Sequence, residues 1–276
     1  GAAATDHYAV IRHICLEIKE RFGREEEVPS DPDALETALG QWFGYANHEL
    51  GRDGSQQSSM IILLDGLNQL QGEARALKWI PDVITPRIRL LLSSTVEATL
   101  VEIRSRGWGE FGMQPLKEDE REGVVVRYLA EFHKSLSAEQ IRSIATDYKC
   151  GHPLFLKTLL EELRLVGRHE DLQLLIDDYL SATGTEDLFQ KMLSRIEEDH
   201  GARAVRDVLS LMWGSRTGLD ETELSDITAL SRLKLATMLA GFDYHIVRKE
   251  GRLTFFHDYL RRAISQRYAA DERSRN

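Results

Sequence analysis

Two short apolar runs that end in polar side chains constrain the fold of this chain more than any other feature of its sequence. Met60–Leu64 is followed directly by Asp65, and Ile88–Leu92 is followed by the polar run Ser93-Ser94-Thr95. Continuous apolar runs of this length are typical of strands that are buried on both faces of a parallel sheet. A strand, a crossover and a second parallel strand gather their ligands where the strands end. The sequence therefore predicts a parallel sheet with a polar site at its carboxyl edge.

The rest of the chain divides into regions of different pattern. Its 276 residues exceed what one hydrophobic core usually organises. Residues 6–22 and 33–50 have the apolar spacing of helices, and beyond Gly112 nearly every segment has this spacing. Near the end, three helical segments precede a hairpin, which is the order of a winged helix. We predict an α/β domain with a partial parallel sheet over 1–112, an all-α helical module over 113–200 and a winged-helix domain over 201–276.

Charge and composition exclude several partners. The formal net charge is −10, from 45 acidic and 35 basic side chains, so the surface on average repels nucleic acid and anionic lipid. The apolar runs are far shorter than the roughly 20 residues that span a bilayer. Cys15 and Cys150 form neither a disulfide framework nor a zinc pattern, which favours a reducing compartment. We expect a cytoplasmic protein with no membrane partner and with no nucleic-acid ligand.

Asp65 is the strongest candidate for chemistry. A carboxylate at the tip of a buried parallel strand is where P-loop NTPases hold Mg²⁺. The alternative interpretation is a core strand followed by an ordinary Asp-Gly turn. No GxxxxGK[ST] sequence occurs in the chain, nor any Gly-Lys dipeptide from which to build one. The chain by itself therefore lacks the usual means of cradling a triphosphate.

Several short motifs, in order along the chain, resemble those of STAND-class P-loop NTPases of the NACHT and NB-ARC-like kind, as in telomerase-associated and nephrocystin-type proteins. The first are the Asp-Gly-Leu-Asn-Gln-Leu run at Asp65, the later Trp-Ile-Pro segment and the Leu-Leu-Ser-Ser-Thr strand end. Gly151-His152-Pro153 resembles the GxP motif, and Phe256-His257-Asp258 lies in a segment that resembles the MHD motif. The resemblance implies that residues 1–112 are an α/β partial parallel-sheet NTPase core and that residues 113–200 are its all-α helical lid. It also implies ATP or ADP and Mg²⁺ as cofactors, with the P-loop lying before Gly1.

The resemblance also implies a role for each matching residue. Asp65 corresponds to the Walker B aspartate, which holds Mg²⁺ through water. Pro153, in the motif that begins at Gly151, corresponds to the proline that packs against adenine. His257 corresponds to the winged-helix histidine that contacts the β-phosphate of bound ADP.

Two departures from the family pattern favour a slow or occupancy-only switch over fast hydrolysis. NACHT proteins often carry acidic residues three and four places after the Walker B aspartate. This chain has Asn68 and Gln69 there, whose amides cannot act as a general base at neutral pH. Ser94 and Thr95 stand where the sensor motif reads the γ-phosphate, but their strand ends without an arginine.

Two of the motifs also have plain structural interpretations. Gly151-His152-Pro153 is equally the start of a helix with proline in its first turn, where proline is favoured. His257 is equally an ordinary residue at a helix N-terminus or a core histidine with satisfied hydrogen bonds.

The leading hypothesis is a signalling ATPase module. In it, ADP holds the lid and the winged helix against the core, and exchange for ATP releases them for self-association. A ligand shifts such an equilibrium only by its differential affinity for the two states. The resemblance implies effector and sensor domains as further partners in a longer chain. One alternative is a DNA-binding winged-helix regulator, although the recognition helix would be the mostly apolar Ser231–Phe242. The other alternative is a scaffold that has lost nucleotide binding.

Overall fold

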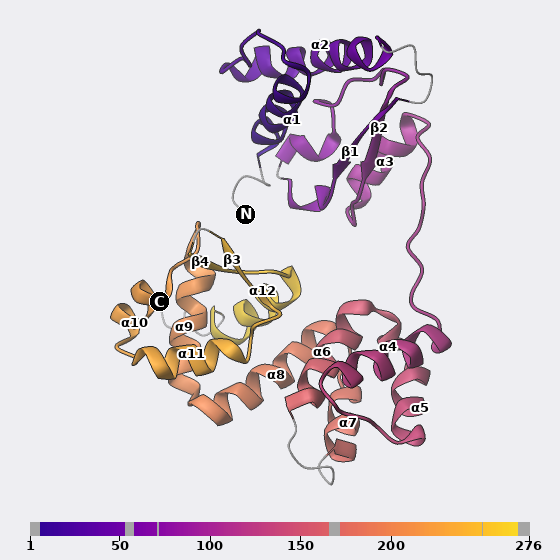
Figure 1. Cartoon of the computed structure of the whole chain (residues 1–276). Helices are drawn as coiled ribbons and strands as arrows, with labels where there is room; N and C mark the ends of the chain where they lie inside the picture. Colours follow the sequence, from indigo (N-terminus) through magenta and orange to yellow (C-terminus); the bar gives the residue numbers. More distant parts are fainter. Residues whose placement is uncertain (1–5, 53–57, 71, 166–171, 250, 270–276) are drawn as a thin grey trace. The chain divides into compact units, whose positions relative to one another are not determined.

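The chain forms two compact units, residues 1–112 and residues 113–276. The computed structural model describes residues 6–52, 58–70, 72–165, 172–249 and 251–269. Within these ranges the N-terminal unit has one hydrophobic core and the C-terminal unit has two. The chain is thus a helix-rich α/β protein with a small parallel sheet (Figure 1).

The N-terminal unit packs helices against a two-stranded sheet. Its helices are α1 (His7–Phe22), α2 (Pro32–Gly51) and α3 (Glu97–Ser105), with the short 3-10 segments η2 (Leu67–Gln69) and η3 (Gly72–Ala76). Asp6 accepts a hydrogen bond from Tyr8 N at the start of α1, and Asp31 accepts one from Ala34 N at the start of α2. These caps are the reason why both helices begin where the sequence predicts.

Strands β1 (Met60–Leu64) and β2 (Ile88–Leu92) pair in parallel, with Leu64 opposite Leu92. One face of this pair joins the core that α1 and α2 form (Figure 1). The other face is open, because Ile61, Leu63 and Leu91 are 69%, 63% and 60% exposed. The prediction that both strands are buried on both faces is therefore wrong for this chain. A parallel pair with helices on one side covers only every second side chain.

The first part of the C-terminal unit is entirely helical. Helices α4 (Glu118–Glu131), α5 (Ala138–Thr146), α6 (Pro153–Leu165) and α7 (Leu172–Leu180) surround one core, with the 3-10 segment η4 (Tyr148–Gly151) leading into α6. Each of these helices lies within or close to a segment of the sequence that has the apolar spacing of a helix. Residues 166–171, between α6 and α7, lie outside the described ranges.

The second part of the C-terminal unit contains the predicted order of three helices and a hairpin. After α8 (Thr185–His200) come α9 (Ala202–Gly214), α10 (Glu221–Thr228), α11 (Arg232–Ala240), the strands β3 (Ile246–Lys249) and β4 (Arg252–Phe255), α12 (Asp258–Ile264) and η6 (Ser265–Ala269). The strands pair in antiparallel fashion, and Leu219 adds a single bridge to Leu253. Glu250, in the predicted hairpin turn, lies outside the described residues.

Helix α8 belongs to both cores of the C-terminal unit. Its Leu188 packs with α4–α7, whereas Phe189, Met192 and Ile196 pack with α9, α11 and α12 (Figure 1). The domain boundary after His200 stays a prediction, as does the assignment of residues 201–276 as a winged helix. Across the described ranges, no helix combines the length and the apolar character that a membrane crossing needs.

Candidate functional site

The carboxyl ends of β1 and β2 bring Asp65 and Ser93 together. Leu64 and Leu92 are register partners, so the residue after each strand lies at the same edge of the sheet. Asp65 is exposed there, and the Ser93 hydroxyl donates a hydrogen bond to its Oδ1 atom. A carboxylate and a hydroxyl at one open edge form a hard oxygen donor set.

The backbone holds this edge in one conformation. Gly66 has a φ of +73°, a value that glycine adopts without strain. Its N–H donates to Ser93 Oγ over 2.8 Å, and Leu67 N donates to Ser93 O over 2.9 Å. Ser93 N in turn donates to Leu64 O over 3.0 Å. Ser93 is therefore fixed on both sides of its backbone and through its side chain.

The other residues predicted for this edge make different contacts. Asn68 is half-buried in η2. Ser94 accepts a hydrogen bond from Val96 N over 3.2 Å, in the turn that precedes α3, and Thr95 is exposed. No described contact joins any of the three to Asp65, and their assignment to a nucleotide site stays a prediction. Sequence reasoning missed Ser93, which could have been found by aligning the two strand ends.

Gly151 and Pro153 lie at the start of α6. Gly151 is buried, and a Cβ atom there would lie 3.0 Å from Pro115 Cβ and 3.1 Å from Arg121 Nη2. Close packing therefore explains the glycine. Pro153 is the first residue of α6 and is exposed, which agrees with the plain structural interpretation of the motif and leaves its ring accessible.

His257 lies directly before α12, half-buried and with its ring 4.3 Å from that of Phe256. Its side chain makes no capping bond to the helix. Burial and the nearby charges of Lys157 and His152 lower its pKa, while Asp258 acts in the opposite direction. The charges of His152 and Lys157, at and near the start of α6, therefore act on His257 in the folded chain.

His245 is a buried histidine on which the charge of His257 acts, and no sequence motif pointed to it. It is only 3% exposed, its ring meets that of Phe189 edge-on at 5.1 Å, and its Nδ1 has no hydrogen-bond partner in the described structure. Burial, with the charges of His257 and Lys157, lowers its pKa to about 4. Its neutral form is thus the stable one at neutral pH.

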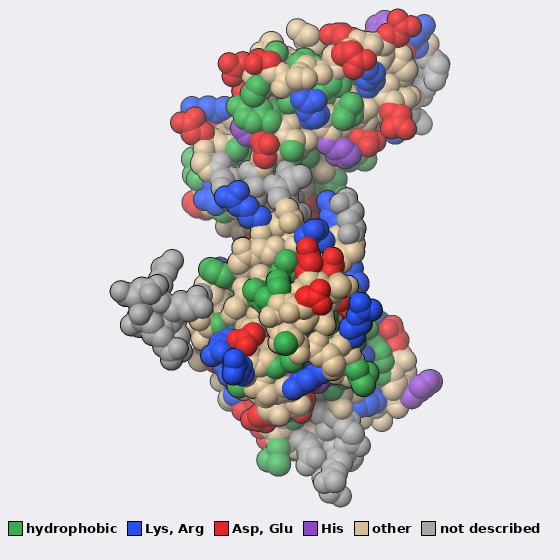
Figure 2. Space-filling view, turned by 90° about the vertical axis from the view of Figure 1, so that its left-hand side faces the viewer, with side chains coloured by type: hydrophobic (Ala, Val, Ile, Leu, Met, Phe, Trp, Pro, Cys, Tyr) green, Lys and Arg blue, Asp and Glu red, His purple; other side chains and the backbone are tan. Residues whose placement is uncertain are grey.

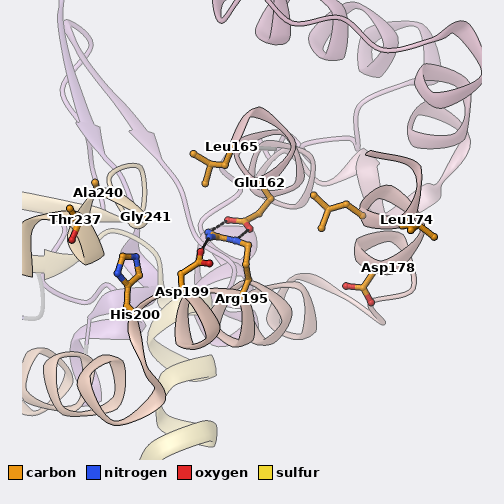
Figure 3. Close-up of a pocket in the computed structure, with 11 residues that line it drawn as sticks. Glu162, Leu165, Leu174, Asp178, Arg195, Asp199, His200, Thr237, Ala240 and Gly241 are labelled. Atoms are coloured by element: carbon orange, nitrogen blue, oxygen red, sulfur yellow. Dashed lines mark hydrogen bonds and ion pairs between the residues drawn. The ribbon is translucent and has the colours of Figure 1, made fainter. Parts of the chain in front are cut away.

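None of the predicted site residues lines a cavity of about 770 Å³ in the C-terminal unit (Figure 3). Its polar centre is Arg195, which donates to both Glu162 oxygens and, over 2.7 Å, to Asp199. Tyr179 also donates to Glu162, over 2.6 Å. Because these groups satisfy one another, the cluster is well suited to joining α6, α7 and α8.

The described residues contain no group of three or more His, Cys, Asp or Glu side chains that could hold a metal ion. An oxygen site at Asp65 does not need such a group, since Mg²⁺ is commonly held by one or two carboxylates together with water and substrate phosphates.

No family model matches the chain, but curated proteins do match it. A TPR repeat-containing protein of Dictyostelium discoideum is 25% identical over 251 residues, which cover 88% of this chain and 15% of that protein. NACHT domain- and WD repeat-containing protein 1 of Homo sapiens is 26% identical, covering 82% of this chain and 14% of that protein. Nephrocystin-3 of Mus musculus is 20% identical, covering 94% and 19%.

Among solved structures, a Walker-type ATPase of Pyrococcus abyssi aligns with a TM-score of 0.43 and 14% identity, over 93% of this chain and 78% of that chain. That score is too low to establish a common fold. The chain spans less than a fifth of the length of the three curated relatives. At low identity, these relatives support a relationship with NACHT-type P-loop NTPases.

Proposed function

We propose that this chain is part of a STAND-type signalling NTPase, an ADP/ATP-controlled switch of conformation and self-association. The observation that carries the proposal is the exposed Asp65 at the carboxyl edge of a parallel strand pair, with the Ser93 hydroxyl against it. The similarity to relatives that are named for a NACHT domain supports the same conclusion.

Asp65 and Ser93 fit a magnesium site with few protein ligands. Asp65 would hold the ion through water, and Ser93 would orient the carboxylate through its hydrogen bond. When bound, Mg²⁺ neutralises charge on the nucleotide phosphates. We expect hydrolysis to be slow, because the amides of Asn68 and Gln69 cannot accept a proton at neutral pH.

The open apolar face of the sheet supports a nucleotide-binding core that further chain completes. Ile61, Leu63 and Leu91 present their side chains to solvent on one face. Contiguous exposed apolar surface commonly marks a place where another element packs. We propose that helices of the complete core cover this face.

The DNA-binding alternative receives less support. Leu235, Met238 and Leu239 of α11 are buried, and Leu233, which is 76% exposed, is apolar. A helix that reads bases needs polar and basic side chains on its outer face. On the face in Figure 2, acidic and basic side chains are interspersed, without one continuous basic region.

The proposal is tested in a longer protein that carries this chain together with a phosphate-binding loop. We expect Asp65→Ala to accelerate the release of Mg-nucleotide more than Asn68→Ala does. The strand tip fixes Asp65 at the edge where the metal would bind, whereas Asn68 lies on the turn that follows. Loss of a charge-assisted contact corresponds to about 1.5–3 kcal/mol, or a factor of roughly 10 to 100.

Stopped-flow release of a fluorescent ADP or ATP analogue, with and without Mg²⁺, measures this difference. Asn68→Ala is the matched control, since it removes a side chain of nearly the same size from the neighbouring turn. Equal release rates for the two variants would refute the Walker B assignment. Absence of nucleotide binding by the unmodified protein would favour a scaffold.

A further inference from the structure

Strand β1 has a neighbouring strand on one edge only. Among the strands of the described residues, it pairs with β2 alone. Two hydrogen bonds at its ends show which backbone groups face β2. Met60 N donates to Arg87 O over 2.8 Å, and Ser93 N donates to Leu64 O over 3.0 Å. The first and the last residue of β1 therefore direct their backbone polar groups to the paired edge.

The alternation of the strand assigns the backbone groups between these ends. Successive residues of an extended strand direct their N–H and C=O groups to opposite edges. Ile62 therefore faces β2, as Met60 and Leu64 do, whereas Ile61 and Leu63 direct their backbone groups to the outer edge of β1. A strand edge with unpaired N–H and C=O groups is a template on which a further strand can pair.

A groove of about 510 Å³ lies between the outer edge of β1 and helix α1. Every residue of β1 lines it, so the groove follows the strand along its length. On the helix side its lining includes Val10, Ile14 and Ile18, which belong to or pack against the core of the N-terminal unit. His13 and Glu17, which also line it, are exposed. The groove thus has an apolar floor and a polar rim.

The position of α1 determines the direction of a strand that fits this groove. Parallel neighbours in a sheet are joined by a crossover, which is usually a helix. Helix α1 lies beside the groove and precedes β1 in the chain (Figure 1). A strand that leads into α1 and occupies the groove would therefore run parallel to β1, with α1 in the crossover.

We infer that the outer edge of β1 and its groove form the docking surface for one further parallel strand of the same protein, which precedes α1 in a longer chain. Neighbouring strands lie about 4.8 Å apart, so this strand would bond to the backbone of Ile61 and Leu63. Its alternate side chains would be apolar and would contact Val10 and Ile14.

The inference rests on the proposed function for the existence of the longer chain. The three curated relatives have the additional length that it needs, since this chain spans less than a fifth of each. It concerns the edge of the sheet, whereas the exposed side chains of Ile61 and Leu63 belong to its open face. A helix that covers the open face would leave the backbone groups at the edge unpaired.

Amide hydrogen exchange, resolved by residue, tests the edge directly. The 276-residue chain is compared with a longer protein that contains this chain and the residues that precede it. We expect the amides of Ile61 and Leu63 to exchange fast in the 276-residue chain and about a hundredfold or more slowly in the longer protein. The amide of Ile62, which faces β2, is the internal control and should be slow in both.

Proline substitutions test the same edge through stability. Leu63→Pro removes an N–H group only from the outer edge, where proline is tolerated, whereas Ile62→Pro removes one that faces β2. In the 276-residue chain, we expect Leu63→Pro to lower the melting temperature much less than Ile62→Pro does. In the longer protein the two variants should lower it by similar amounts, because both edges of β1 are then paired.

Fast exchange at Ile61 and Leu63 in the longer protein would overturn the inference, as would equal effects of the two prolines in the 276-residue chain. Slow exchange at these amides in a dimer of the 276-residue chain would assign the edge to a second copy and overturn the proposed occupant. The proposed function is tested separately: if Asp65→Ala accelerates nucleotide release, that function stands even when the strand inference fails.

Discussion

Among the described histidines of the C-terminal unit, only His245 is buried, which makes it an internal probe of folding. Its pKa lies at about 4 in the folded chain, against 6.5 for an ordinary histidine. Between these values the unfolded chain binds a proton at this residue that the folded chain does not. The free energy of unfolding should therefore fall as pH drops from 6.5 towards 4, by up to about 3 kcal/mol from this residue.

Urea unfolding across this pH range measures the effect. We expect His245→Gln to be less stable at pH 7 but to lose less stability on acidification than the unmodified chain. His13→Gln, at an exposed position, is the control for replacing a histidine as such. An unchanged pH slope in His245→Gln would mean that other groups cause the acid sensitivity.

Among single residues, the position of Asp65 was predictable from the sequence, whereas the contact that Ser93 makes with it was not. Asp65 lies at a strand end as predicted, because the sequence itself contains a continuous apolar run followed by a carboxylate. Ser93 was missed, since its contact with Asp65 depends on the register between two strands that lie apart in the sequence. Likewise, the charge of Lys157 acts on His257 only because folding brings together segments that lie far apart in the sequence.

At the scale of elements, the open sheet face predicts how substitutions on the two faces of β1 change the free energy of unfolding. Leu63 is 63% exposed, whereas its neighbour Ile62 packs against the core of the N-terminal unit. In this chain, Leu63→Lys should change the free energy of unfolding by no more than about 0.5 kcal/mol, as is usual for surface sites. Ile62→Lys should cost about 3 kcal/mol or more, because it places a charge against apolar groups.

Thermal and urea unfolding of the two variants compare the faces of one strand. In a longer protein with a complete core, Leu63→Lys should become destabilising too, since the proposed additional elements cover that face. Similar losses for both variants in the 276-residue chain would contradict the observed one-sided packing.

Strands β1 and β2 show why the sequence pattern predicted burial of both sheet faces incorrectly. A run such as Met60–Leu64 has the same sequence whether or not a second layer of helices covers its outer face. Its hydrophobic pattern therefore does not reveal whether such a layer is present. Helix α3 was missed for a related reason. Val96 at its N-cap makes no side-chain hydrogen bond, and in the helix only Thr99 and Ile103 are buried, which leaves a weak pattern.

At the scale of the molecule, the order of elements was predictable, but their assignment to cores was not. Helical periodicity located α8 correctly, yet its side chains divide between two hydrophobic cores. A helix shared in this way couples the packing of α4–α7 with that of α9–α12.

The proposed switch depends on His257, through which a bound nucleotide would control conformation and self-association. The most direct measurement is the ADP release rate, together with the oligomer size, of a full-length protein with and without His257→Ala. A histidine hydrogen bond to a phosphate is worth roughly 1.5–3 kcal/mol, so we expect ADP release from the variant to be about ten to a hundred times faster, with more self-association. An unchanged release rate combined with a lower melting temperature would show that His257 stabilises the fold without contacting the nucleotide, and the proposed switch contact would be wrong.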